Sequence, residues 1–533
     1  MLRLDRRRLL AAAGLAAAPI RPAAAQRRAD TLRYVTGGAV NTLDPVMLGA
    51  TQEATALSAC TYDRLLKFGR VPAGADSFVF DFGQIEGELA EGFEVSPDGC
   101  VITLHLRRGA VWHDGSAVTA EDVKWSLDRA VSAPSMAKAQ LATGSLTAPE
   151  QMRVTGEHTV EITLPQPDRL AVPNLATLYA PMVNSRLARL HATAEDPWAT
   201  AWLKDNLAGG GAYTVSAYVP GQQVTLVRHE RWTGGTPPHF RQLILQTVPE
   251  ASTRSSLVER GDADITTGLQ AEDLRALERS GAVRVVSTAM PTGFAGLVFN
   301  TRMPPFDQVA VRRALALAIP YEAIFATALA GRGTRLYGAG WSGQPLTAGF
   351  PQALPLHTDL VRARAALAEA GHPGGFETTL SYSVSRAAFA EPAAALIQEA
   401  FGRIGVRVRI EKLPDPQFVE AVTAKRLPLL LERSLALFPA TEYFFRVFLS
   451  GPGRWNLSAW DDAEVNALLP QARFEPDPAR ADAIAARLIG ILADQVPMAP
   501  IGQPSFDVVI ARGLRGFTTW PIYYPDLRDL VRA

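Results

Sequence analysis

The stretch from residue 89 to residue 130 places the strongest constraint on how this chain folds. Ser96-Pro97-Asp98-Gly99 predicts a turn, because proline presets one φ angle and glycine tolerates a positive one. The segment from Val101 to Leu106 is rich in β-branched residues and predicts a strand. After a second turn at Asp114-Gly115, residues 119 to 122 match the S/T-x-x-D/E capping pattern that starts a helix. The stretch therefore predicts a turn, a strand and a helix, in that order.

The N-terminus has the pattern of an export signal. Arg6-Arg7-Arg8 is followed by Leu9-Leu10 and an apolar run over residues 11–18, and Ala23-Ala24-Ala25 fits a small-residue cleavage site. Arginines followed by leucines are typical of a twin-arginine signal, and an ordinary secretory signal is the alternative. The apolar run is too short to span a bilayer, and no cysteine near the cleavage site favours a lipoprotein anchor. We therefore expect residues 1–25 to be removed after about Ala25 during export.

Size and charge limit the remaining possibilities. A chain of 533 residues is too long for one compact core, so two or more lobes are expected. The 53 basic and 53 acidic residues give no nucleic-acid footprint. Cys60 and Cys100 are the only cysteines, and they match no zinc spacing. An exported protein permits a disulfide between them, and two free thiols are the alternative.

Catalytic motifs are weak or incomplete in this sequence. The chain contains no G-x-S-x-G elbow. The stretch His229 to Thr233 lacks the second histidine of a zinc-protease helix. Residues Ser135 to Lys138 fit S-x-x-K, but the S-D-N and K-T-G motifs that accompany it in penicillin-binding enzymes are missing. We therefore predict no catalytic residues, no metal site and no cofactor.

The order of the motifs in the first stretch resembles a known family. The chain reads A-E-G-F, S-P-D-G, L-H-L-R-R-G, W-H-D-G and T-A-E-D-V between residues 90 and 123. This order is similar to that of the extracellular solute-binding proteins of the dipeptide, oligopeptide and nickel type (family 5), which serve ATP-binding-cassette importers. Further matches are L-D-P at 43–45, Y-D-x-L at 62–65 on an expected helix, G-D-A-D-I at 261–265 and V-R-x-A-L at 311–315. The resemblance covers nearly all of the chain after residue 25.

The resemblance implies an α/β fold of the large, class II periplasmic-binding-protein type. Two lobes are joined by a hinge around a central cleft. Residues 26–290 are expected to form lobe I, with an extra subdomain, and residues 291–497 to form lobe II. Residues 498–533 then return to lobe I. The crossings between the lobes are expected near 287–294 and 496–502.

The resemblance also implies a function. The protein is expected to be a monomeric periplasmic binding protein that captures a small solute, a peptide or related amino compound, by hinge closure. It then delivers the solute to the permease and ATPase complex in the inner membrane. An exported hydrolase or transferase, and a sensor that presents its closed form to a receptor, are the alternatives from other classes.

The ligand class is limited by one missing residue. Peptide-binding members of the family carry an aspartate that pairs with the peptide amine, in the loop after a lobe II strand. Between Glu432 and Glu442 this chain has no obvious counterpart, and Glu442 is the nearest acid. A buried ammonium without a carboxylate partner is costly. Ordinary peptide binding is therefore not favoured, and small polar or modified amino compounds, opines or sugars are the remaining candidates.

The candidate ligand-binding residues fall into three groups. Glycines and a polar residue border the cleft in relatives, aromatic residues offer walls, and charged residues offer ion-pair partners. Core packing is the alternative for each aromatic residue, and a structural ion pair is the alternative for the arginine. In chain order the candidates are Gly37, Gly38, Asn41, Trp341, Arg433 (for a ligand carboxylate), Phe438, Glu442 and Trp455.

Overall fold

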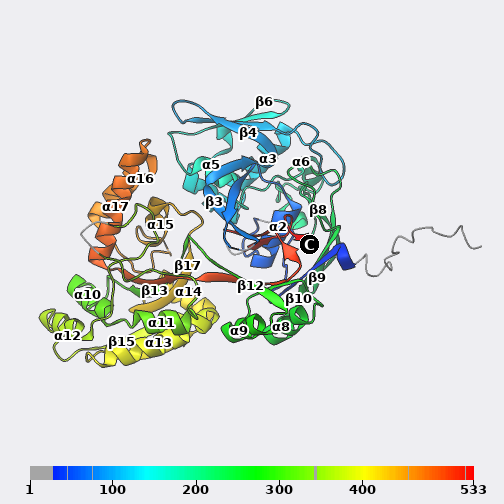
Figure 1. Ribbon diagram of the computed structural model, residues 1–533. Coiled ribbons are helices and arrows are strands. Elements are labelled where there is room, and N and C mark those ends of the chain that lie inside the picture. The colour runs from blue at the N-terminus through cyan, green and yellow to red at the C-terminus, as the bar shows by residue number, and fades with distance from the viewer. Residues whose placement is uncertain (1–27, 45, 75, 341–344, 454, 522–523) are drawn as a thin grey trace, which may run out of the picture.

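The computed structural model describes residues 28–44, 46–74, 76–340, 345–453, 455–521 and 524–533. These residues form two lobes that are joined by strands near the base of the view (Figure 1). The expected export signal lies outside the described residues, as does Trp341. Among the helices of the described ranges, none combines the length and the apolar character that a membrane span requires.

Lobe I is built on a seven-stranded sheet with the order β12-β19-β11-β1-β10-β9-β8. Its central strands β1, β10 and β11 run parallel to one another, which places their carboxyl ends at one edge. The side chains of β1 alternate between faces: Leu32 packs in a cluster with Leu57 of α2, while Val35 packs with Val258 of α8. The bounds are β1 (Thr31–Thr36), α2 (Gln52–Thr61), β8 (Tyr213–Val219), β9 (Gln223–Arg228), β10 (Gln242–Thr247), α8 (Ala251–Glu259), β11 (Ile265–Thr267), α9 (Ala271–Ser280), β12 (Val283–Ala289) and β19 (Ser505–Ala511).

The stretch from residue 89 to residue 130 forms the start of a subdomain on lobe I. It supplies two strands of a four-stranded sheet, in the order β4-β5-β7-β6, and the helix α3. The Thr119 N–H donates to the Asp122 carboxylate at 3.0 Å, so the expected capping box is confirmed. The bounds are β4 (Ala90–Val95), β5 (Val101–Leu106), α3 (Ala120–Ser132), α4 (Met136–Leu141), β6 (Met152–Gly156), β7 (Thr159–Thr163), α5 (Ala171–Leu175), α6 (Ser185–Arg189) and α7 (Thr200–Leu203), with short 3₁₀ turns at Ala142–Gly144 and Pro149–Gln151.

A second four-stranded sheet joins the two ends of the chain. Its order is β2-β3-β21-β22, and a two-stranded pair, β20–β23, flanks β21 and β22 in the sequence. The bounds are β2 (Leu66–Pro72), β3 (Ser77–Gly87), β20 (Leu514–Arg515), β21 (Phe517–Trp520), β22 (Tyr524–Asp526) and β23 (Val531–Arg532).

The helix expected over residues 62–65 is wrong. Helix α2 ends at Thr61, and Tyr62 already has extended backbone angles. The physical reason lies in the tertiary structure: the Arg64 N–H and its guanidinium both bind the buried Glu88 carboxylate, which fixes this segment as the entry to β2.

Lobe II is built on a six-stranded sheet with the order β14-β18-β13-β17-β15-β16. Strand β15 runs parallel to both of its neighbours, β16 and β17. The bounds of the strands are β13 (Gly293–Phe299), β14 (Thr334–Arg335), β15 (Glu377–Ser383), β16 (Arg407–Leu413), β17 (Leu429–Leu435) and β18 (Met498–Gln503). The helices are α10 (Val309–Ala318), α11 (Tyr321–Ala328), α12 (Leu360–Glu369), α13 (Ala387–Gly402), α14 (Asp415–Thr423), α15 (Thr441–Phe448), α16 (Ala463–Phe474) and α17 (Pro478–Gln495), with a 3₁₀ turn at Val384–Arg386.

The chain crosses between the two large sheets twice. The first crossing, residues 290–292 between β12 and β13, lies where it is expected. The second lies at Pro504, and not near Met498, because the fully buried strand β18 still pairs with β13 in the lobe II sheet. The two crossings lie side by side, with the Met290 N–H 3.3 Å from the Pro504 carbonyl oxygen.

The cysteines are both free thiols. Cys60 is buried on α2, and Cys100 lies next to β5 of the subdomain. The structure therefore favours the second of the two alternatives, two free thiols.

Candidate functional site

A cleft of about 1130 Å³ lies between the lobes. Its lobe I wall follows β1 and β11, and its lobe II wall follows β15 and β17. Each wall thus uses the carboxyl edge of parallel strands, which is where open α/β sheets bind ligands. Both sheets present this edge to the same space.

Two glycines after β1 let charged side chains approach the cleft floor. The Gly38 N–H donates to Glu53 Oε1 at 3.1 Å, and a Cβ atom on Gly38 would collide with that carboxylate. A Cβ atom on Gly37 would lie 3.1 Å from Arg254 Nη1. A side chain at either position would therefore displace the Glu53 carboxylate or the Arg254 guanidinium.

Arg254 is a nearly buried cation in this wall, with only 4% of its surface exposed. Its guanidinium donates to the carbonyl oxygens of Val248 (2.8 Å), Pro249 (2.7 Å) and Gly268 (2.9 Å). Burial lowers the pKa of Arg254 below its ordinary value. No carboxylate lies within 4 Å of it in the part of the chain that the structure describes. Arg254 therefore organises two cleft loops and adds positive charge beside them.

Lobe II contributes two further arginines at strand ends. Arg386 follows β15, and its Nε atom lies 3.6 Å from Glu432 Oε1. Glu432 also accepts a hydrogen bond from Ser434 Oγ at 2.8 Å. Burial raises the pKa of Glu432, while the Arg386 guanidinium lowers it. The positive charge of Arg386 is thus partly compensated within lobe II.

Arg433 has no such compensation. It lies on β17, is partly buried, and donates from Nη2 to the Ser505 carbonyl oxygen at 3.1 Å, across the lobe boundary. Within the described ranges, no carboxylate lies within ion-pair distance of its guanidinium. A cation in a cleft that lacks its own anion is a natural partner for a ligand carboxylate.

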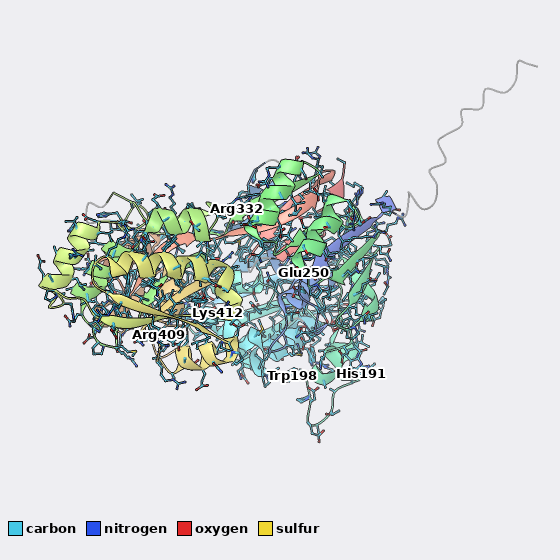
Figure 2. The ribbon with its side chains drawn as sticks, turned by 90° about the horizontal axis from the view of Figure 1, so that it is seen from below. His191, Trp198, Glu250, Arg332, Arg409 and Lys412 are labelled. Carbon is cyan, nitrogen blue, oxygen red and sulfur yellow. The ribbon has the colours of Figure 1, made fainter. Side chains whose placement is uncertain are left out.

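Each acid that lines the cleft accepts a hydrogen bond from a neighbouring group. Glu53 accepts from Gly38, and Asp507 accepts from Ser505 Oγ at 3.0 Å. Arg332, at the boundary between the lobes in Figure 2, lies 3.6 Å from Asp507 and 2.8 Å from Glu278. Among the described lining residues, the side chains that are charged at neutral pH are three arginines and two acids, so positive charge is in excess.

One part of the cleft is apolar. Leu48, with 59% of its surface exposed, and Met136 line it from lobe I. Val447, Phe448 and Trp455 line it from lobe II, with Trp455 half-exposed and its ring 6.3 Å from that of Phe448. The cleft therefore offers a charged region and an apolar wall to one ligand.

The structure brings four of the candidate residues together in this cleft: Gly37, Gly38, Arg433 and Trp455. Three others lie elsewhere. Asn41 binds the Gly49 carbonyl and the Thr51 N–H, and so shapes the loop before α2. Phe438 is fully buried against Phe82 of lobe I, with ring centroids 5.6 Å apart.

Glu442 also lies outside the main cleft. It pairs with Arg446 at 3.3 Å and lines a separate cavity of about 480 Å³. Burial raises the pKa of Glu442, and the Arg446 guanidinium lowers it. This carboxylate therefore already has a cationic partner within lobe II.

Sequence reasoning missed four charged residues of the cleft: Glu53, Arg254, Arg386 and Asp507. For Arg386 a signal was present, since it directly follows a predictable strand whose carboxyl end faces the same way as that of β17. Glu53, Arg254 and Asp507 lie on or beside elements whose position depends on the folded sheet, so no local pattern identifies them.

The two weak catalytic motifs have structural roles. Ser135 caps α4, where its Oγ atom accepts the Lys138 N–H at 3.3 Å. His229 Nδ1 lies 3.3 Å from the Gly211 carbonyl oxygen. No group of three metal-ligating side chains occurs within the described ranges.

Comparison with known proteins identifies the family of this chain. The family model "Bacterial extracellular solute-binding proteins, family 5 Middle" matches residues 84–456. The probable D,D-dipeptide-binding periplasmic protein DdpA of Escherichia coli (strain K12) is 26% identical over 494 residues, which is 90% of either chain. Heme-binding protein A of Haemophilus influenzae is 25% identical over 526 residues, covering 93% of this chain and 91% of the relative.

Solved structures share the fold. The periplasmic binding protein DppA from Helicobacter pylori, in complex with the peptide STSA, superposes with a TM-score of 0.76 at 20% identity, over 96% of this chain and 100% of that one. NikA from Brucella suis, in complex with Fe(III)-EDTA, superposes with a TM-score of 0.80 at 17% identity, over 94% and 100%. The chain therefore belongs to family 5 of the bacterial extracellular solute-binding proteins, the solute-capturing components of ATP-binding-cassette importers.

Proposed function

We propose that this protein captures a small solute that carries at least one carboxylate, holds it between its lobes, and delivers it to a membrane permease and its ATPase. The observation that carries the proposal is Arg433, a guanidinium in the interlobe cleft that has no carboxylate partner among the described residues. A ligand carboxylate at this position restores charge balance and adds charge-assisted hydrogen bonds. Catalysis forms no part of the proposal.

Relatives support a carboxylate-bearing ligand. Among them are binding proteins for dipeptides and for glutathione, at 25–28% identity. Both kinds of ligand end in a carboxylate, while their amines and side chains differ. The carboxylate is therefore the chemical group that transfers most directly from those ligands to this cleft.

Recognition of a peptide amine has less support. The chain after β17 presents Leu435, Ala436 and Leu437 to the cleft, where a loop carboxylate is expected in peptide binders. The acids of the cleft, Glu53 and Asp507, already accept hydrogen bonds from Gly38 and Ser505. Neither acid lies in the loop after β17, so a peptide ammonium would have to bind elsewhere in the cleft than it does in peptide binders.

We expect a mixed library of dipeptides and tripeptides to bind weakly or not at all in calorimetry. Derivatives of one dipeptide separate the two ends of the ligand. N-acetylation should leave the weak affinity unchanged, because the loop after β17 has no carboxylate to pair with the amine. C-terminal amidation should remove detectable binding, because Arg433 loses its partner. Tight, sequence-tolerant binding that acetylation abolishes would contradict this assignment and would give Glu53, Asp507 or Glu442 the role of amine receptor.

Export through the twin-arginine route is part of the proposal and rests on Arg6-Arg7-Arg8 before Leu9-Leu10. Replacement of all three arginines with lysine should trap the precursor in the cytoplasm, which cell fractionation detects. A matched triple substitution, Arg27→Lys, Arg28→Lys and Arg33→Lys, should leave export intact. Normal export of the first variant would rule out this route in favour of the general secretory one, and the mature protein would still be periplasmic.

A further inference from the structure

Side chains of lobe II reach across to lobe I along one side of the cleft. Arg473, near the end of α16, donates to Asp168 Oδ2 from Nε at 3.0 Å and from Nη2 at 2.7 Å. The same Nη2 atom lies 3.1 Å from Ser145 Oγ. In Figure 1, α16 and α15 face α5 and β3, well above the strands that cross between the lobes. The contact therefore lies on the side of the molecule opposite the crossings.

Groups of lobe I also hold the Asp168 carboxylate that Arg473 binds. The Asp168 side chain is fully buried, while that of Arg473 is 18% exposed. Asp168 also accepts from Ser145 Oγ at 2.6 Å and from the Leu170 N–H at 3.0 Å. These bonds hold the carboxylate in one orientation, so the guanidinium meets a fixed acceptor.

Two side chains of α15 also form hydrogen bonds with lobe I. Arg446 donates from Nη2 to the Thr143 carbonyl oxygen at 3.2 Å, and the Tyr443 hydroxyl lies 3.4 Å from Gln140 Oε1. Burial raises the pKa of Tyr443 to about 12, so the hydroxyl keeps its proton at neutral pH and acts as the donor. We call Ser145, Asp168, Tyr443, Arg446 and Arg473 the rim latch.

The rim latch is continuous with the ligand cleft. Gln140 and Thr143, which receive the bonds from α15, line that cleft, and so does Tyr443 itself. The bonds between the lobes therefore fix part of the cleft wall, although Arg473, Asp168 and Ser145 do not line it. Each of these bonds joins a side chain of lobe II directly to a group of lobe I.

We propose that the rim latch holds the lobes closed without solute, so that the closed form is already substantially populated in the ligand-free protein. The proposal rests on the capture of a solute between the lobes, proposed above, and adds how the closed form is maintained. A ligand shifts an equilibrium only by its differential affinity for the two states. A latch that pre-populates the closed state reduces the shift that the solute must produce, and Arg473 and Tyr443 act here as positioning residues.

Solution scattering tests whether the ligand-free protein is closed. The protein is stripped of bound solute by unfolding, dialysis and refolding, and its radius of gyration is compared with the value calculated from the closed structure. We expect the wild type to match the closed value. Arg473→Met should lower the closed-to-open ratio about tenfold or more, the range for a lost hydrogen bond to a charged group, and should increase the radius of gyration.

Two milder variants and one control accompany it. Ser145→Ala and Tyr443→Phe each remove one or two hydrogen bonds of the latch and should give intermediate values. If circular dichroism shows that Arg473→Met does not fold, the radii of gyration of these two variants are compared with that of the wild type instead. The control is Arg487→Met, because Arg487 on α17 pairs with Glu464 within lobe II and is 55% exposed. Its radius of gyration should equal that of the wild type.

Two results would overturn the latch. The first is a ligand-free wild type that is already as expanded as the Arg473→Met variant. The second is a folded Arg473→Met variant that stays as compact as the wild type. Hinge closure itself is judged separately: it fails only if the natural solute compacts neither the expanded wild type nor a latch variant.

Discussion

Replacement of Glu88 with alanine is expected to lower the free energy of unfolding by roughly 3–5 kcal/mol, the usual cost of removing one partner from a buried ion cluster. Glu88 is fully buried and binds two guanidiniums, those of Arg64 at 2.8 Å and Arg528 at 2.7 Å. Arg528 also pairs with Asp526 at 2.8 Å. The cluster joins β2 to the C-terminal segment, so its loss leaves an uncompensated buried cation where the two ends of the chain meet.

The protonation of Glu88 sets the condition for this measurement. Burial alone raises its pKa, but the Arg64 and Arg528 guanidiniums outweigh burial and hold the pKa of Glu88 below its ordinary value. A carboxylate with a lowered pKa in the folded state contributes stability above its unfolded pKa, near 4.5, and loses that contribution as the pH falls below it. The effect of the substitution should therefore be full at pH 7 and smaller at acid pH.

Chemical denaturation of Glu88→Ala and Glu161→Ala at pH 7 measures the difference. Glu161 forms an ion pair with Arg153 on the subdomain surface, and the Arg153 side chain is 72% exposed. Removal of this pair should cost less than about 1 kcal/mol. Equal midpoints for the two variants would show that the buried cluster contributes no more than a surface pair.

Replacement of Arg433 with alanine is expected to weaken binding of the natural solute by about 2–3 kcal/mol, or roughly 30-fold to 150-fold in Kd. The reason is that the ligand carboxylate loses its only uncompensated cation in the lobe II wall of the cleft. Arg433→Lys keeps the charge but not the planar fork, and should give an intermediate loss. Calorimetry with the solute released from the wild-type protein measures all three affinities.

The matched control is Arg409→Ala. Arg409 lies on β16, at the edge of the lobe II sheet, and its side chain is 68% exposed (Figure 2). This variant should bind as the wild type does. An unchanged Kd in folded Arg433→Ala would make Arg433 a structural residue only, and the recognition of the carboxylate would pass to Arg386 or Arg254.

Local signals in the sequence predicted the elements that depend on local chemistry. The capping box at Thr119 and the strand from Val101 to Leu106 both lie where the sequence places them. The helix expected at Tyr62 to Leu65 failed because a contact with Glu88, distant in sequence, decides the backbone there. The second crossing was placed too early because a buried strand that precedes a crossing looks the same in sequence as one that follows it.

In the candidate site, too, local sequence identified some residues, while the positions of others depend on tertiary structure. Arg433 was identifiable because it lies at the end of an apolar strand beside the expected cleft. Phe438 and Glu442 follow it closely in sequence, but the turn into α15 directs them toward the lobe contact and a second cavity. Arg254 and Glu53 come from helices of lobe I, and only the parallel pairing of β1, β10 and β11 brings those helices to the same edge. Sequence alone therefore predicted the fold class and part of the cleft, but not its balance of charge.

The most direct test of the account is the identity and fate of the solute that the protein carries. Denaturation of protein purified from its own periplasm, followed by mass spectrometry, should release one small compound that bears a carboxylate. Added back at 100 times its Kd, that compound should stabilise the stripped protein by about 2.7 kcal/mol in a melting assay. It should be recovered with its mass unchanged after prolonged incubation. A compound that the purified protein converts to a product, or one that binds without stabilising the folded state, would contradict the account of this cleft as the binding site of a transport protein.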